Sequence, residues 1–301
     1  MTSITKLAAL GIATALALAG CGSASNIEGK SDDTGSSDTL VVGSQDYYSN
    51  EIIAEIYAQS LEKAGKKVDR QLKIGQREVY MPELQAGKID VFPEYTGNLL
   101  QYYKPDTMAR SPEQVHTELT SALPGGLKAL EQAPATDQDS YVVTKAFAEE
   151  NSLKQIGDLA KIPDLKIAGN SELESRPYGP KGLRETYGVE ATIKPAEDSG
   201  GPLTVKALRD GEVQIADIYT AAPVLADGDL VVLEDPQNLF LSSNVVPIVS
   251  SKVDAQTAET LNKVSTVLTP EDLIAMNKRS VDEKTSASVI AGDWLKSKGL
   301  A

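Results

Sequence analysis

Histidine, cysteine and tryptophan occur only once each in these 301 residues, as His116, Cys21 and Trp294. One histidine and one cysteine cannot build a disulfide or a Cys-based metal site, and a Cys–His catalytic pair would need both of them. The sequence also contains no G-x-S-x-G, H-E-x-x-H, P-loop or G-x-G-x-x-G pattern. We therefore expect no metal, no cofactor and no catalysis.

Positive charge is scarce as well. The chain has 29 Lys and Arg against 43 Asp and Glu, which gives a formal net charge of −14. Such a surface repels phosphate backbones, so nucleic acid is not expected as a partner. The same negative field mildly favours cationic ligands. Pairs of carboxylates occur in any chain this acidic, and they do not by themselves indicate an enzyme.

The amino terminus has the features of a secretion signal. Lys6 precedes the apolar run 7–19, which is too short to span a bilayer. Residues 18–21, Leu-Ala-Gly-Cys, resemble a bacterial lipobox, which implies cleavage of signal peptide 1–20 and lipidation of Cys21. Residues 21–38 are rich in Gly, Ser and Asp and read as a flexible tether. The protein is thus expected outside the cytoplasmic membrane, anchored to it through a lipid.

Two stretches 124 residues apart follow one pattern. ELQAGKIDVFPEYT (83–96) and ALRDGEVQIADIYT (207–220) each have a leucine, a glycine three residues later, an alternating apolar run and a final Tyr-Thr. Glycine ends helices in a left-handed cap, and alternation with period two indicates a strand. Two copies of this unit predict two similar α/β lobes. Because ligands bind outside the carboxyl ends of the strands in open α/β sheets, Tyr95 and Tyr219 are expected to line one cleft.

The remaining pattern predicts alternating strands and helices. The strands are expected at 40–43, 68–74, 89–92, 141–143, 165–169, 189–193, 213–218, 230–233 and 244–249, and the helices at 49–64, 79–86, 111–132, 205–209 and within 255–300. A strand–helix–strand series with right-handed crossovers forms a parallel sheet. We expect one lobe from residues 39–137 and 243–301, a second lobe from 138–242, and two crossovers between them.

Several segments together resemble one protein family. GSQDYYSNEIIAEIYAQSLEKAG, GKIDVFPEYTG, LRDGEVQIADIYTAAP, DLVVLEDPQNLF and NVVPIV are similar to the osmoprotectant-binding proteins of ABC importers of the ProX and OpuC type. The resemblance covers residues 39–301. It implies a type II periplasmic-binding-protein fold, delivery of a small osmolyte to a membrane permease, and a cage of aromatic rings for a quaternary ammonium group. Such a group cannot donate hydrogen bonds and is attracted to the faces of aromatic rings.

The resemblance carries over to single residues unevenly. Tyr95 of P-E-Y-T-G, Tyr219 of the second copy and Tyr141 at the crossover are implied as cage rings. Arg176 is the candidate for an anionic group of the ligand. The other candidate ligand-binding residues are Asn50, Glu78, Tyr47, Thr96 and Asn244. Thr204 and Ser243 stand where relatives often carry tyrosine, so the pocket is expected to be larger or more polar than a betaine cage.

We interpret the chain as the solute-binding component of an ABC importer for glycine betaine or a related quaternary ammonium compound, acting as a monomer. One alternative is the same importer fold with a different, more polar ligand. A second is a secreted hydrolase or transferase on a two-lobed fold, which would need a titratable pair in the cleft. A third is a structural or signalling lipoprotein without a ligand.

Overall fold

The computed structural model describes residues 38–300. The expected signal peptide, Cys21 and nearly all of the expected tether lie outside the described residues. Within 38–300 no helix has both the length and the apolar character needed to cross a membrane.

The first of two sheets is built from both ends of the described chain. Its order is β2-β1-β3-β10-β4, with β1 parallel to β2 and β3, and β10 antiparallel to β3 and β4. The strands are β1 (Thr39–Gly43), β2 (Lys67–Gln71), β3 (Val91–Tyr95), β4 (Leu127–Ala129) and β10 (Val245–Ser250). All residues of β3 and β10 are buried, as central strands covered on both faces require.

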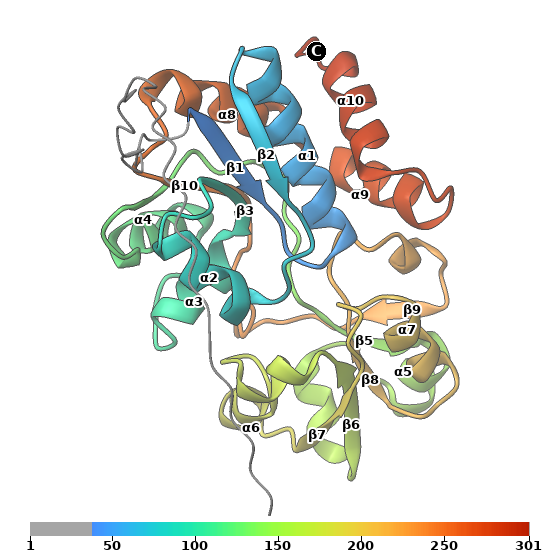
Figure 1. Ribbon diagram of the computed structural model, residues 1–301. Helices are drawn as coiled ribbons and strands as arrows, with labels where there is room; N and C mark the ends of the chain where they lie inside the picture. Colours follow the sequence, from blue (N-terminus) through green and yellow to red (C-terminus); the bar gives the residue numbers. More distant parts are fainter. Residues whose placement is uncertain (1–37, 301) are drawn as a thin grey trace, which may run out of the picture. The chain divides into compact units, whose positions relative to one another are not determined.

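Helices cover both faces of this sheet (Figure 1). One apolar cluster joins it to α1, α8, α9 and α10 and includes Trp294, while another joins it to α2, α3 and α4. These helices are α1 (Tyr48–Lys63), α2 (Arg77–Gln85), α3 (Thr96–Tyr103), α4 (Pro112–Ala122), α8 (Ala255–Val267), α9 (Pro270–Val281) and α10 (Ala287–Ser297).

The second sheet has the same arrangement as the first. Its order is β7-β6-β8-β5-β9, with β6 parallel to β7 and β8, and β5 antiparallel to β8 and β9. Its elements are β5 (Tyr141–Thr144), α5 (Lys145–Asn151), η1 (Ile156–Lys161), β6 (Leu165–Gly169), η2 (Ser171–Ser175), α6 (Pro180–Tyr187), β7 (Ala191–Pro195), α7 (Pro202–Arg209), β8 (Ile215–Asp217), η3 (Pro223–Ala226) and β9 (Leu230–Val232).

The chain crosses between the sheets twice, after β4 and after β9. The two crossing segments bond to each other. Asn244 Nδ2 donates to Ala133 O at 2.8 Å, and Asp137 N donates to Ser243 O at 3.1 Å. These bonds satisfy backbone groups of both segments outside the two sheets.

The internal repeat has the same backbone geometry in both copies. Gly87 and Gly211 adopt left-handed φ angles of 70° and 72°. Gly87 N bonds to Leu84 O at 3.1 Å, and Gly211 N bonds to Leu208 O at 3.1 Å. The residue after each glycine bonds one residue further back, which completes a Schellman end. The predicted helix–turn–strand unit is confirmed, and it leads into the equivalent strands β3 and β8.

The predicted helix 111–132 was wrong at its carboxyl end. Helix α4 ends at Ala122, and residues 127–129 form strand β4 beside β10. Pro124 cannot continue a helix, and Gly126 has a φ of 95°. The segment therefore turns back and adds the edge strand of the first sheet.

Candidate functional site

A cavity lies where the carboxyl ends of β1, β3, β6 and β8 meet the first crossing segment. The centre of a water molecule can reach about 50 Å³ of it, which is room for a few waters. Its lining comes from both sheets and consists of Gln45, Tyr47, Gln76, Arg77, Tyr95, Asn98, Asp137, Asp139, Asn170, Glu172, Leu173, Arg176, Tyr178, Asp217 and Tyr219. Elements with equivalent places in the two sheets thus build one cavity, as the repeat predicted.

Four of the lining residues are tyrosines. Tyr47, Tyr95 and Tyr178 are buried, and Tyr219 is partly buried. The ring of Tyr47 meets the ring of Tyr219 edge to face, with 5.0 Å between centroids, so a ring beside the first sheet touches one beside the second. Aromatic faces and a negative surround are the features that bind an organic cation.

Tyr95 is held in place by the acid that precedes it. Glu94 Oε2 accepts from Tyr95 N at 2.8 Å, and the same carboxylate pairs with Arg77 in a two-bond fork at 2.7 and 2.9 Å. Tyr80 Oη also donates to Glu94 Oε1 at 2.5 Å. Both partners of the ion pair are buried. The two bonds fix Arg77 at the cavity wall, and the Glu94 carboxylate neutralises its guanidinium.

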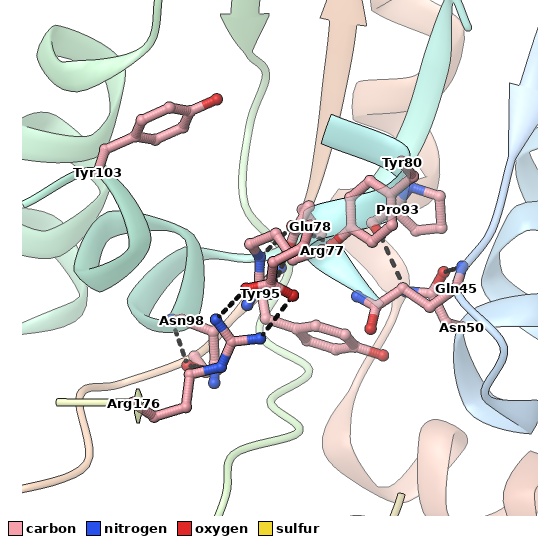
Figure 2. Close-up of polar contacts among 12 residues, drawn as sticks. Gln45, Asn50, Arg77, Glu78, Tyr80, Pro93, Tyr95, Asn98, Tyr103 and Arg176 are labelled. Atoms are coloured by element: carbon pink, nitrogen blue, oxygen red, sulfur yellow. Dashed lines mark hydrogen bonds and ion pairs between the residues drawn. The ribbon is translucent and has the colours of Figure 1, made fainter. Parts of the chain in front are cut away.

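Arg176, which follows η2 beside the second sheet, is also neutralised by a carboxylate, that of Glu78. Its Nη1 and Nη2 donate to Glu78 Oε1 and Oε2 at 2.6 and 3.2 Å (Figure 2). The pair joins the loop after η2 to helix α2, and the Glu78 side chain is 47% exposed. Two hydrogen bonds from Asn98 Nδ2 also cross the cavity, one to Asp139 Oδ2 at 2.5 Å and one to Tyr178 Oη at 3.0 Å. These bonds hold the two sides of the cavity together.

Several buried polar atoms of the cavity wall have no hydrogen-bond partner. They are Gln45 Nε2, Tyr95 Oη, Glu172 Oε2 and Asp217 Oδ1. A buried polar atom without a partner costs about 1–3 kcal/mol, and such atoms are rare in native proteins. Four of them around one cavity show that its wall is polar and can form hydrogen bonds with water or with a bound molecule.

Burial dominates the acid–base behaviour of the site. It raises the pKa of Asp137 to about 6, although Tyr47 Oη donates to Asp137 Oδ2 at 2.7 Å and stabilises the charged form. Burial also raises the pKa of Tyr95, and the negative charge of Asp137 adds to this. The phenols of the site are therefore neutral at any physiological pH. Within 38–300 no group of three or more His, Cys, Asp or Glu side chains is arranged to hold a metal ion.

Of the nine candidate ligand-binding residues named above, four line the cavity and come together there: Tyr95, Tyr219, Tyr47 and Arg176. Tyr141 lies instead in the core of the second sheet, where its hydroxyl donates to Tyr178 O at 2.5 Å. Asn50 accepts from Gln45 N and donates to Pro93 O, both at 2.9 Å, so it ties the end of β1 to β3 (Figure 2).

Thr96 and Asn244 lie together at the second crossing segment. Asn244 N donates to Thr96 Oγ1 at 3.0 Å, and Thr96 N donates to Asn244 O at 2.9 Å. Glu78 reaches Arg176 and is not part of the cavity wall. Thr204 and Ser243, the two positions where relatives often carry tyrosine, are not part of the cavity wall either. Thr204 Oγ1 donates to Asp198 at 2.6 Å, and Ser243 Oγ donates to Asn98 Oδ1 at 2.5 Å.

Sequence reasoning missed most of the polar wall, including Arg77, Asn98, Asp137, Asp139 and Asp217. Individual acids give no signal in a chain with 43 of them. The position of an acid relative to a predicted strand is informative, however. Asp217 ends the strand that leads to Tyr219, and Asp139 precedes the predicted strand at 141–143. Polar residues at the carboxyl ends of strands were the available clue.

The comparisons with known proteins agree with this fold. Residues 38–297 match the family model described as the substrate binding domain of ABC-type glycine betaine transport system. The glycine betaine-binding protein YehZ of Escherichia coli (strain K12) is 28% identical over 274 residues, covering 86% of this chain and 90% of that protein.

Solved structures give the same fold. One described as a glycine betaine/carnitine/choline ABC transporter matches with a TM-score of 0.69 at 19% identity, over 87% of this chain and 99% of that one. Lactococcal OpuAC, in its closed-liganded conformation with glycine betaine, matches with a TM-score of 0.63 at 15% identity, over 87% and 96%. The predicted type II periplasmic-binding-protein fold is confirmed. With the family model matching nearly all of the described residues, the chain belongs to the substrate-binding domains of ABC-type glycine betaine transport systems.

Proposed function

We propose that this protein is the extracytoplasmic solute-binding component of an ABC importer and that it captures glycine betaine or a related quaternary ammonium osmoprotectant. The observation that carries the proposal is the cavity lined by four tyrosines and several acids between two equivalent sheets. The family of the chain and its similarity to the glycine betaine-binding protein YehZ support it. Binding would come from ring contacts and desolvation in a closed cavity, without covalent chemistry.

The proposal includes the cellular setting. Residues 39–137 with 243–301 would form one lobe and residues 138–242 the other, and the permease would recognise the form in which the lobes close on ligand. Lipidation at Cys21 would keep the monomeric protein at the outer face of the membrane. Tyr47, Tyr95, Tyr178 and Tyr219 would contact the ligand. Asn50, Thr96 and Asn244 would act indirectly, through the backbone that carries these rings.

The test is a calorimetric titration of the protein with glycine betaine, choline, carnitine, proline betaine and ectoine, after unfolding and refolding to remove any carried ligand. Saturable binding of at least one quaternary ammonium compound in the micromolar range is expected. No heat with any of them would reject the osmoprotectant assignment and direct the search to more polar ligands.

The Arg176–Glu78 pair is expected to control how fast a ligand leaves. It joins the two sides of the cavity, so it can form only when the cavity is closed. Exposed ion pairs contribute about 0.2–1 kcal/mol, so Glu78→Gln should raise the dissociation rate about 1.5- to 5-fold and change the association rate little. Stopped-flow dissociation at low and high salt measures this.

The difference between wild type and Glu78→Gln should shrink as salt is raised, because the pair is partly exposed and screened. The matched control is Glu83→Gln on the same helix, which removes an exposed pair with Lys88 on one side of the cavity only. Equal dissociation rates for wild type and Glu78→Gln would show that the pair does not hold the cavity closed.

A further inference from the structure

Strand register brings two carboxylates of the cavity together. In the antiparallel pair of β5 and β8, Tyr141 lies opposite Asp217. Bonds from Ile218 N to Ser140 O and from Thr220 N to Gln138 O continue this register, which sets Asp139 opposite Tyr219. Facing residues and residues two apart share one side of such a pair. Asp139 and Asp217 therefore project to the same side as diagonal neighbours.

Both side chains are buried and both line the cavity. Asp139 is 7% exposed and Asp217 is 6% exposed. Asp139 Oδ2 accepts from Asn98 Nδ2 at 2.5 Å, while Asp217 Oδ1 has no partner. Burial raises the pKa of Asp217 well above its usual value, and the charge of Asp139 and a hydrogen bond between the two carboxyl groups raise it further. Burial and the neighbouring carboxylate therefore both favour the protonated form of Asp217 in the free protein.

Among residues 38–300, no positive charge without a carboxylate partner lines the cavity beside this pair. The titratable groups around it are Asp137 on the crossing segment, Glu172 on η2, the phenols of Tyr141, Tyr178 and Tyr219, and the guanidinium groups of Arg77 and Arg176. Arg77 is bound in its fork to Glu94, and Arg176 is bound to Glu78. No lysine or histidine of the described part of the chain lines the cavity.

The wall therefore carries an excess of negative charge, lacks a positive charge to balance it, and has no place for an additional negative one. A singly charged organic cation would supply the missing charge. The carboxylate of a zwitterion would meet Asp137, Asp139 and Glu172, with both arginines already engaged. Gln45 Nε2 and Tyr95 Oη are the fully buried side-chain donors of the wall that have no partner.

We propose that a monocationic ligand displaces the proton shared by Asp139 and Asp217, so that each capture releases about one proton and the cavity selects a monocation over a zwitterion. This inference rests on the proposed function, because it concerns the ligand of the same site. Charge balances in the step: the protonated pair loses one proton to solvent as one monocation enters, and the charge of the site is unchanged.

The displaced proton makes binding depend on pH in one direction. Below the pKa of Asp217 in the free protein, the cation competes with a proton, so its affinity falls about tenfold for each unit by which the pH is lowered. Above that pKa Asp217 is already ionised, and the affinity no longer changes with pH. Asp137 titrates near pH 6 and faces the same cavity, so its contribution has to be separated by mutation.

The experiment is calorimetric titration of the full chain with choline, a monocation, and with glycine betaine, a zwitterion. At one pH near neutrality it is repeated in phosphate and in Tris, whose ionisation enthalpies differ. The slope of the observed heat against the ionisation enthalpy gives the number of protons released. We expect about one proton released with choline, none with glycine betaine, and at least tenfold tighter binding of choline.

The matched variant is Asp217→Asn, which keeps the shape and a hydrogen bond to Asp139 but cannot hold the shared proton. It should bind choline without releasing a proton and should lose most of the pH dependence. Asp139→Asn is the second variant, with the same expectation, and it serves if the first does not fold. Proton release that persists in a folded Asp217→Asn protein would assign the release to another group, such as Asp137, and overturn the proposal.

The outcomes for the two claims differ. Binding of choline to wild type without proton release, or glycine betaine bound as tightly as choline, overturns the proposal and leaves the proposed function in place. If neither compound nor any other quaternary ammonium binds, the proposed function fails and the proposal fails with it.

Discussion

Replacing Glu94 with alanine is expected to lower the free energy of unfolding by about 3–5 kcal/mol, the usual effect of removing one partner of a buried ion pair. Glu94 is fully buried and neutralises Arg77, whose side chain is 7% exposed. The carboxylate also accepts from Tyr80 Oη and Tyr95 N. Without it, a buried guanidinium, a hydroxyl and a backbone N–H all lose their acceptor. For a protein of this size, the melting temperature should fall by roughly 6–20 °C.

Thermal and urea unfolding of wild type and variant measure the effect. Helix α2 also supplies the control. Glu78, the residue after Arg77, makes a partly exposed pair with Arg176. Glu78→Ala should cost no more than about 1 kcal/mol.

A double variant, Arg77→Met with Glu94→Leu, removes both charges and replaces them with apolar groups of similar size. It should be more stable than Glu94→Ala alone, because the largest part of the cost comes from the charge that is left behind. Equal losses for Glu94→Ala and Glu78→Ala would contradict the view that burial determines the contribution of the pair.

Local signals in the sequence were enough to predict the framework of the fold. A glycine after a leucine-bearing helix requires a left-handed backbone, and both Gly87 and Gly211 have it. Alternation then predicts the strands, and the offset of 124 residues predicts equivalent sheets. Each copy of the unit is determined by its own short segment of sequence, so it can be recognised without knowledge of the residues that pack against it.

The P-E-Y-T-G motif illustrates which residue roles could not be predicted from the sequence. The sequence marked Tyr95 as a cavity residue, but Pro93, Glu94, Thr96 and Gly97 have structural roles. Pro93 O accepts from Asn50, and Thr96 bonds to the second crossing segment 146–148 residues away. A Cβ on Gly97 would lie 2.7 Å from Ser242 O, so this position admits only glycine without a shift of that segment. Such roles depend on distant partners that no local pattern contains.

The candidate site was incomplete for the same reason. Tyr141 opens a crossover strand, as expected, but its side chain packs in the core of the second sheet, where its hydroxyl donates to Tyr178 O. The sequence interpretation assigned Arg176 to an anionic group of the ligand. The structure gives it Glu78 as a partner, 98 residues earlier in the chain. Ion pairs across a cavity join residues far apart in the chain, so they can be identified only from the three-dimensional structure.

Replacing Tyr95 with leucine is expected to weaken the binding of a quaternary ammonium ligand about tenfold. A cation on a buried ring gains roughly 0.5–2 kcal/mol, and 1.4 kcal/mol corresponds to a factor of ten. Leucine is chosen because Tyr95 also packs in the core against α1, where alanine would leave a cavity and add a loss of stability. Calorimetric titration with the compound that binds wild type most tightly measures the change.

Two further variants make the result specific to the ring. Tyr95→Phe keeps the ring and removes a buried hydroxyl that has no partner, so affinity should stay within about threefold and stability should not fall. Tyr103→Leu removes a tyrosine from helix α3 that is not part of the cavity wall and lies apart from the other side chains in Figure 2, so it should bind as wild type does. An equal loss of affinity in Tyr95→Phe and Tyr95→Leu would assign the role of Tyr95 to its hydroxyl, and the aromatic cage would have to be formed by Tyr47, Tyr178 and Tyr219 alone.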